Sequence, residues 1–285
     1  MVWGLIFVFG LIIGSFLNVV ICRLKTNEDV TRTRSHCPHC GQILSWWELV
    51  PIVSFLFLRR RCWHCRKLLS WQYPLVELGT GILFIIFFWW LGGSLINWWL
   101  AGPKIFIWSI FELAYWFFMV SVLLVIFVYD LKHYLIPDSL IGLGSAAALF
   151  FSLANVFYFG NNSLALGFIP TGLNAWQPFL GALLAALGAG GFFGLIVLIT
   201  RGRGMGRGDI KLAFLMGLIL GWPKILVALF LAFLGGATLG LILVALGRKN
   251  LKSALPFGPF LVSGTMVAVW LGSFISAWYQ ALLGF

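Results

Sequence analysis

The stretch VWGLIFVFGLIIGSFLNVVIC, residues 2–22, contains no charged side chain. A helix that crosses a membrane needs about 20 predominantly apolar residues. This run is longer than the apolar core of a signal peptide, and no Lys or Arg precedes it as one would in such a peptide. We therefore expect residues 2–22 to form a membrane-spanning helix that stays in the protein.

The rest of the chain repeats this pattern. Of its 285 residues, 61% are hydrophobic and 9% are charged, and the mean hydropathy is +1.02, whereas a soluble domain has about 25% charged residues. The sequence thus predicts an all-α polytopic membrane protein with about eight transmembrane helices. The run 210–222 is short for a full crossing, so we expect a half-buried or tilted span there. The seven further runs are 75–92, 105–129, 139–159, 178–200, 210–222, 224–247 and 256–283.

The net charge of +11 fits an orientation signal better than a nucleic-acid surface. If residues 23–73 are cytoplasmic, every Lys and Arg except Lys104 and Lys224 falls on the cytoplasmic side. Both termini then lie outside. We expect three parts: a first transmembrane helix (1–22), a cysteine-bearing cytoplasmic domain (23–73) and a transmembrane domain (74–285).

Four of the five cysteines form two Cys-x-x-Cys pairs, Cys37 with Cys40 and Cys62 with Cys65. Two such pairs present four thiolates tetrahedrally, as structural Zn²⁺ requires, and the metal would supply folding free energy to a segment with little apolar core. Two disulfides or a redox Cys-x-x-Cys motif are the alternatives. Neighbouring histidines are possible substitute ligands that we expect to be spectators, and the fifth cysteine reads as packing: His36, His39, His64 and Cys22.

Only three acidic residues follow Glu112, and each stands where an apolar run meets the cytoplasm in this topology. Ionisable groups at membrane depth are costly and usually functional. Asp130 has a plainer interpretation, a helix-end residue paired with Lys132 or His133. Asp138 follows Pro137 at the start of a helix, so N-capping is favoured there.

Asp209 closes the sequence GRGMGRGD, residues 202–209, in which glycine occupies every second position. An N-cap role needs no such glycines, whereas a glycine-rich backbone can approach another chain closely. A phosphate-binding loop is disfavoured, because the GxxxxGK[ST] pattern is absent and no strand precedes the loop. Two aspartates that met here would not both ionise easily. One could then act as general base on water and the other as general acid, which is aspartic proteolysis.

These motifs resemble those of the prepilin peptidases (type IV leader peptidases), polytopic aspartic proteases of the GxGD type. The resemblance covers most of the chain, about residues 10–80 and 125–262. Arg207 departs mildly from the family, because a smaller residue is frequent between those two glycines. The matching blocks are Gly206-Arg-Gly-Asp209 followed by Ile210-Lys211-Leu212, Asp130 with Leu135-Ile-Pro-Asp138, Gly14-Ser-Phe-Leu-Asn-Val-Val20, and the two cysteine pairs followed by Glu77.

The resemblance implies an intramembrane endopeptidase of the bacterial inner membrane. It would cut the basic leader from type IV prepilins and pseudopilins after a glycine, at the cytoplasmic membrane face. N-methylation of the new terminus with S-adenosylmethionine would follow, although no glycine-rich binding signature for that cofactor is visible. By the same resemblance, Asp130 and Asp209 are the catalytic pair. Gly206, Gly208 and Lys211 support the catalytic loop, Asp138 is a secondary candidate, and the four cysteines organise the loop tied to methylation.

Two other classes of protein account for part of this pattern. An ion-coupled transporter explains the carboxylates but not the cysteine pairs, and transporter carboxylates usually sit near mid-membrane. A non-enzymatic scaffold with a zinc module explains the cysteines but leaves the Gly-Asp block without a role. The sequence leaves open which pilins are cut and the oligomeric state.

Overall fold

The computed structural model describes residues 1–26, 34–92, 99–100, 102–159, 176–202, 205–248 and 255–283. Four basic residues that the predicted topology places on the cytoplasmic side, and one glycine of the sequence 202–209, fall outside these ranges: Arg32, Arg203, Lys249 and Lys252, and Gly204. The chain forms two compact units, Met1–Val125 and Ile126–Phe285. Each is considered by itself.

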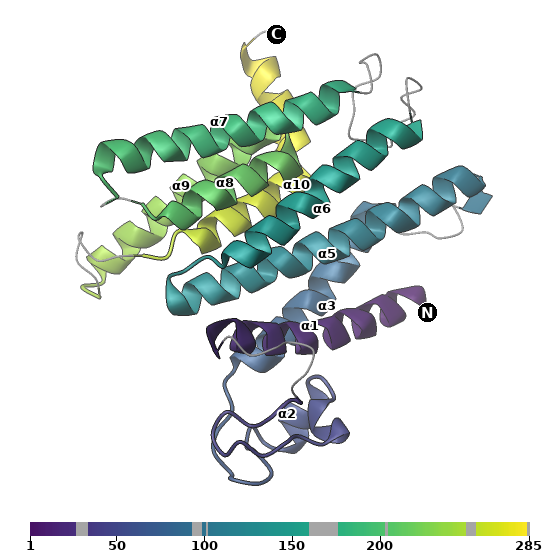
Figure 1. Cartoon of the computed structure of the whole chain (residues 1–285), viewed down its shortest axis with the longest axis vertical. Helices are drawn as coiled ribbons and strands as arrows, with labels where there is room; N and C mark the ends of the chain where they lie inside the picture. Colours follow the sequence, from purple (N-terminus) through teal and green to yellow (C-terminus); the bar gives the residue numbers. More distant parts are fainter. Residues whose placement is uncertain are drawn as a thin grey trace. The chain divides into compact units, whose positions relative to one another are not determined.

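The first unit contains a helical hairpin and an irregular segment between its arms (Figure 1). Its elements are α1 (Val2–Thr26), the 3₁₀ turn η1 (Trp46–Leu49), α2 (Val53–Phe57), α3 (Gln72–Trp90) and the greater part of α5 (Pro103–His133). Within the described residues the segment between α1 and α3 has no strand, only two isolated bridges, His36 to Ile43 and Arg61 to Leu68.

Helices α1 and α3 pack antiparallel at very short range. A Cβ placed on Gly10 would lie 2.7 Å from the Cα of Gly81, and one on Gly14 would lie 2.7 Å from the Cα of Glu77. One turn further on, the Asn18 side-chain amide donates to the Tyr73 carbonyl at 3.1 Å. The three contacts are four residues apart on each helix and run in opposite directions along α1 and α3. On α1 they include a Gly-x-x-x-Gly pattern, which allows membrane helices to pack closely.

The irregular segment is fixed to this hairpin through polar side chains. Oε2 of the buried Glu77, on α3, accepts the backbone N–H of Ile52 at 2.8 Å, where Ile52 has a left-handed backbone with φ of 61°. Within the segment, Oε2 of Glu48 accepts the Ser45 N–H at 2.8 Å and so caps η1. These two acidic side chains stabilise the loop, because each accepts a hydrogen bond from a backbone N–H group of a turn.

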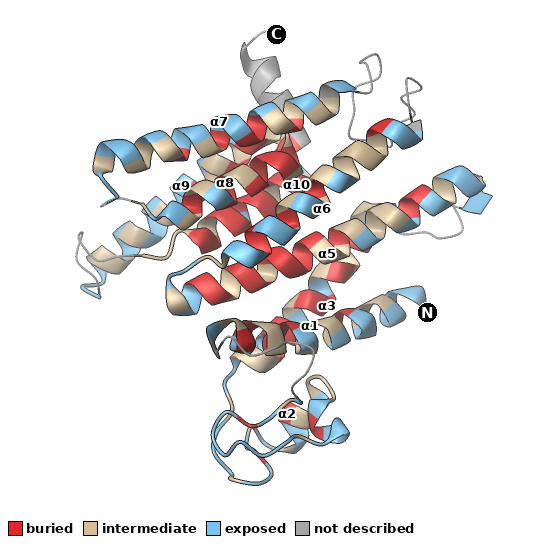
Figure 2. Cartoon of the chain, viewed as in Figure 1, coloured by how far each residue is buried: buried red, intermediate tan, exposed pale blue. Residues whose placement is uncertain are grey.

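The second unit surrounds one short helix with longer ones. Helix α8 contacts α6, α7, α9 and α10, and several of its side chains, among them Leu212, Leu215 and Met216, are fully buried. Figure 2 shows buried residues gathered on α8, whereas the outer faces of α7 and α9 are exposed. The elements are α6 (Asp138–Phe159), α7 (Trp176–Thr200), α8 (Arg207–Leu220), α9 (Lys224–Ala245) and α10 (Gly258–Leu283), with the last turns of α5.

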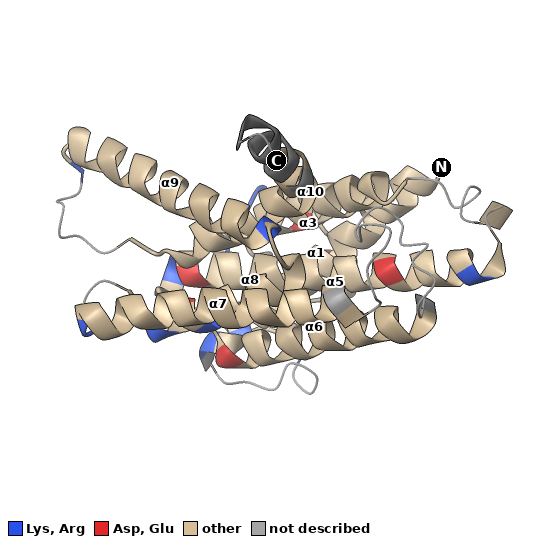
Figure 3. Cartoon of the chain, turned by 90° about the horizontal axis from the view of Figure 1, so that it is seen from above, with Lys and Arg blue, Asp and Glu red and all other residues tan. Residues whose placement is uncertain are grey.

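The prediction of a nearly all-helical multi-pass membrane protein is confirmed, with eight spans as an approximate number. Six helices among the described residues are long and apolar enough to cross a membrane: α1, α3, α5, α6, α7 and α9. Helix α10 is apolar over Gly258–Gly272. Helix α8 has 14 residues and so extends about 21 Å, less than the roughly 30 Å of a hydrocarbon core. Figure 3 shows the charged residues mostly near helix ends, with long uncharged stretches between them.

The close α1–α3 contact predicts that Gly10→Ala destabilises the hairpin. The new methyl group would overlap the α3 backbone, and overpacking of this kind typically costs about 1–3 kcal/mol. Gly4→Ala is the matched control, because nothing lies within 4 Å of a Cβ at Gly4. Thermal unfolding of the full chain in detergent should give a lower Tm for Gly10→Ala and an unchanged or higher Tm for Gly4→Ala. Equal Tm values would contradict the close packing.

Candidate active site

Asp130 lies in the last turn of α5 and is only 4% exposed. Its Oδ2 accepts the backbone N–H of Gly258, the first residue of α10, at 3.0 Å. The partner is thus a backbone amide 128 residues away, rather than the neighbouring Lys132 or His133 of the plainer interpretation. A carboxylate buried this deeply needs such a donor, because its desolvation is costly.

Asp209 lies in the first turn of α8 and is 8% exposed. Its Oδ2 accepts the backbone N–H of Gly206 at 3.1 Å, and Gly206 is the N-cap residue of α8. Asp209 is therefore at position N3 and not at the N-cap, where the plainer interpretation placed it. It makes the N3-to-N-cap half of a capping box and keeps its negative charge near the positive end of the helix dipole.

The two aspartates interact electrostatically. The pKa of Asp209 is raised to about 6, mainly by burial and in smaller part by the nearby charge of Asp130, while the hydrogen bond from the Gly206 N–H opposes the rise. Each carboxylate has its Oδ2 on a glycine amide. Among the described residues, no protein donor reaches either Oδ1. The two carboxylates are therefore near enough for their charges to interact, which makes it harder for both to ionise.

The neighbouring glycines provide room for this arrangement. A Cβ on Gly206 would lie 3.5 Å from Oδ2 of Asp209, and one on Gly208 would lie 3.1 Å from the Cβ of Ile136. Ile136 belongs to the turn between α5 and α6. Gly208 thus lets the start of α8 approach that turn. A side chain on Gly208 would crowd Ile136, and one on Gly206 would contact the Asp209 carboxylate.

Lys211 and Asp138 form an ion pair, with Nζ 2.7 Å from Oδ1. Both side chains are largely exposed, so the pair contributes little to stability. Its effect is to link the first turn of α8 to the first turn of α6. The Asp138 carboxylate accepts no backbone hydrogen bond in the described part of the chain, so its partner is Lys211 and not the helix end that the N-cap interpretation required.

The four paired cysteines meet at one point of the first unit. The Sγ atoms of Cys37, Cys40, Cys62 and Cys65 all lie within 4.8 Å of one another, and those of Cys37 and Cys65 are 4.0 Å apart. None of the four is in a disulfide. Four thiolates around zinc stand about 3.8 Å apart, given a Zn–S distance of about 2.3 Å. The donor set and its spacing therefore fit a closed tetrahedral metal site.

Gly258, which donates to Asp130, is a residue of the candidate site that the sequence interpretation missed. It stands in Pro256-Phe257-Gly258-Pro259, directly at the start of α10. A Cβ on this residue would lie 2.6 Å from Oδ2 of Asp130. The available signal was the Pro-x-Gly-Pro sequence at a helix start, since proline favours the first helical position. Nothing in that sequence points to Asp130.

Two buried, interacting aspartates at helix ends define a class of protein: a multi-pass membrane protein equipped for general acid–base chemistry. Residues 117–241 match the type IV leader peptidase family, and residues 8–91 match the bacterial peptidase A24 N-terminal domain. The chain belongs to the type IV leader peptidase family.

Several relatives carry the name prepilin leader peptidase/N-methyltransferase. One from Bacillus subtilis is 32% identical, with 97% of each chain covered. One from Pseudomonas putida is 31% identical, with 98% of this chain and 93% of the relative covered. One from Myxococcus xanthus is 35% identical over 86% of this chain, which spans 64% of that relative. Among solved structures there is no significant match.

The Gly258 contact predicts that Gly258→Ala impairs turnover without unfolding the protein. The methyl group would displace the Asp130 carboxylate, and if this carboxylate takes part in catalysis, a small misplacement costs roughly tenfold to 100-fold in rate. We expect kcat to fall by this amount and KM to change little. Gly235→Ala is the control, because a Cβ there meets only Phe260 at 3.4 Å. Full turnover by Gly258→Ala, measured as cleavage of a prepilin substrate, would refute the positioning role.

Proposed function

We propose that this chain is an intramembrane aspartic endopeptidase that removes the basic leader from type IV prepilins and pseudopilins. We assign catalysis to Asp130 and Asp209. One observation carries this assignment: the two carboxylates are buried, each is held by a glycine amide, and the charge of Asp130 raises the pKa of Asp209. The family to which the chain belongs, and the names of its relatives, support the substrate.

In this mechanism the dyad shares one proton. The ionised aspartate takes a proton from a water molecule, whose oxygen attacks the scissile carbonyl carbon. The protonated aspartate donates to the carbonyl oxygen, which gives a tetrahedral intermediate. Collapse of this intermediate breaks the C–N bond: the aspartate that took the water proton donates it to the leaving nitrogen, and the other aspartate takes back the proton of the hydroxyl group as the C=O bond re-forms. The Gly206 and Gly258 amides keep both carboxylates oriented throughout.

The short α8 helps to explain how water and substrate reach the dyad. Asp209 lies in the first turn of a helix that is too short to cross a bilayer, so we place the dyad at the cytoplasmic membrane face rather than at mid-membrane. A prepilin is itself a membrane helix with a basic leader. It must unwind locally before its peptide bond is exposed, and a glycine before that bond lowers the cost.

We propose the bacterial inner membrane as the location, with 1–22, 23–73 and 74–285 as first helix, cytoplasmic loop domain and peptidase domain. In the loop domain the four cysteines would hold a structural Zn²⁺, which supplies folding free energy to a segment with few helical turns. N-methylation with S-adenosylmethionine follows from the family. The basic pocket at residues 57–68 does not suit the positive sulfonium of that cofactor, so we assign it no residues.

The dyad predicts that Asp130→Asn and Asp209→Asn each lower cleavage by roughly a hundredfold or more, because an amide cannot serve as general acid or base. The measurement is a gel shift of a prepilin-type substrate mixed with the full chain in liposomes. Thermal unfolding of both variants checks that the fold persists. Full activity in either variant would remove that residue from the site.

Asp138→Asn should behave differently and serves as the matched control. Its carboxylate meets Lys211 in an exposed ion pair, which contributes about 0–1 kcal/mol. We expect a small loss of stability and substantial remaining turnover. Complete inactivity in a folded Asp138→Asn protein would move this residue into the catalytic site.

The cysteine cluster predicts about one zinc per chain, lost when Cys37 and Cys62 are both replaced by serine. Elemental analysis of the purified full chain measures the metal directly. Cys22→Ser is the control, because Cys22 lies outside the cluster and should leave the zinc content unchanged. Folded wild-type protein without metal would end the zinc assignment.

A further inference from the structure

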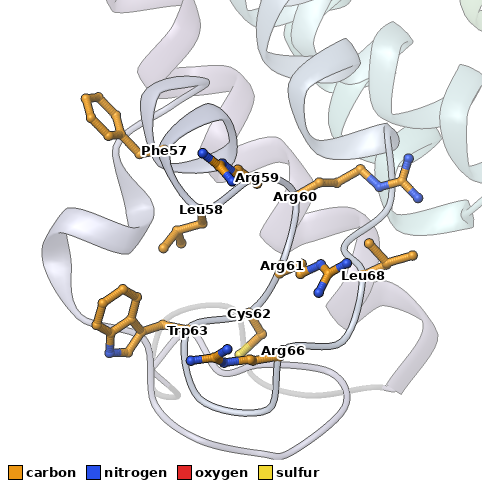
Figure 4. A pocket seen from close by; sticks show the side chains of 9 residues that line it. All are labelled: Phe57, Leu58, Arg59, Arg60, Arg61, Cys62, Trp63, Arg66 and Leu68. Carbon is orange, nitrogen blue, oxygen red and sulfur yellow. The ribbon is translucent and has the colours of Figure 1, made fainter.

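A pocket of about 720 Å³ lies in the segment between α1 and α3, next to the cysteine cluster. Figure 4 shows the side chains that line it. We infer that this pocket binds the phosphate group of an anionic phospholipid, through Arg59, Arg61 and Arg66. This inference goes beyond the peptidase function and does not depend on it.

The first argument is charge. No acidic residue lines the pocket, and Arg59, Arg61 and Arg66 form no ion pair with any described residue. Arg60 also lies at this pocket, but its guanidinium carbon stands 5.5 Å from the centre of the Trp71 ring. Three arginines, each with five N–H donors, therefore line one cavity that no acidic residue lines. Phosphate oxygens match guanidinium geometry well.

The zinc site does not account for this charge. A zinc ion with four thiolates carries two negative charges, whereas residues 59–67 contain four arginines and Lys67. Positive charge remains after the metal centre is counted. Because only Cys62 of the four ligands lines the pocket, the cavity lies beside the cluster and is not the metal site itself.

Backbone geometry gives a second argument, from the two Cys-x-x-Cys turns. Gly41 directly follows the first pair, with φ of 71°, and Arg66 directly follows the second pair, with φ of 56°. This left-handed conformation favours glycine. The first turn has the residue that the backbone prefers, whereas the second has a strained arginine whose side chain lines the pocket. The backbone conformation therefore does not favour an arginine at position 66. Binding of an anionic ligand by its side chain would account for an arginine there.

The apolar part of the pocket indicates a lipid rather than a free anion. Phe57 and Trp63 line it, yet they are 85% and 62% exposed to solvent. Exposed aromatic side chains beside arginines are typical of the membrane–water interface. A soluble phosphate ion would leave these rings in water, whereas a phospholipid would cover them.

The position of the pocket in the chain agrees with this occupant. Leu68, on the pocket wall, is four residues before Gln72, which begins the candidate span α3. Four residues reach at most about 14 Å, so the pocket stays near the headgroup layer. The segment is also held to α3 by the Glu77–Ile52 hydrogen bond. A basic prepilin leader would be repelled by the same arginines, so the pocket is not a leader site.

The test measures binding of a fluorescent short-chain phosphatidylglycerol to the full chain in neutral detergent, by anisotropy. The triple variant Arg59→Gln/Arg61→Gln/Arg66→Gly should bind at least about tenfold more weakly. Lys67→Gln removes one charge from the same segment outside the pocket and should change binding less than about twofold. Unlabelled phosphatidylglycerol should compete well, and phosphatidylcholine and inorganic phosphate poorly.

Each contrary result overturns the inference. Unchanged affinity in the triple variant excludes the pocket, and an equal loss in Lys67→Gln shows non-specific attraction. Competition by inorganic phosphate at the same concentration as lipid shows a free-anion site, and equal competition by phosphatidylcholine shows no selectivity for anionic lipid. Zinc content and leader cleavage should stay at wild-type levels in the triple variant. If that variant does not fold, Arg66→Gly alone decides, because glycine suits the backbone there.

Discussion

The arrangement of the site depends on one constraint: a carboxylate removed from water needs hydrogen-bond donors, and in a helical membrane protein most backbone donors are already used within helices. The free N–H groups are those at helix starts. Asp130 takes the amide of Gly258 at the start of α10, and Asp209 takes that of Gly206 at the start of α8. The positions of these two helix starts therefore determine where the carboxylates can lie.

The same constraint gives α8 its unusual form. A helix that crossed the bilayer fully would put its first turn on one surface and expose more of its length to lipid, whereas α8 has 14 residues and is enclosed by four other helices. Gly217, in its middle, lies so close to the backbone of Ala186 on α7 that a side chain there would overlap it. Close packing of α8 thus fixes the backbone position of Asp209, and the Gly206 N–H holds its carboxylate in place.

Part of this could be predicted from the sequence. The apolar runs located the helices, and the scarcity of acidic residues drew attention to Asp130 and Asp209. Both signals could be used because they depend only on the composition of the chain along its length. The Cys-x-x-Cys spacing likewise predicted a cluster that the structure brings within ligand distance. In each case the signal is local, because a charged residue beside an apolar run, or two cysteines at short spacing, can be recognised in the sequence without knowledge of the fold.

Contacts between distant segments could not be predicted in this way. Gly258 meets Asp130 across 128 residues, and Lys211 pairs with Asp138 from another helix. Local reasoning favoured a helix cap for Asp138 and offered one as the plainer interpretation of Asp209, because capping is a common local role of aspartate. The Gly-x-x-x-Gly pattern of α1 is present in the sequence, but only the structure shows that it packs against the backbone of α3.

The two units also divide the proposed functions of the chain. Every described hydrogen bond to the dyad comes from Ile126–Phe285, whereas the cysteine cluster, the basic pocket and the Glu77 anchor all lie in Met1–Val125. The hydrogen bonds that orient Asp130 and Asp209 are therefore formed within the second unit. Loss of the proposed zinc would act first on the loop between α1 and α3, because that loop contains the four cysteines. The carboxylate pair thus takes both of its backbone donors from helix starts of its own unit.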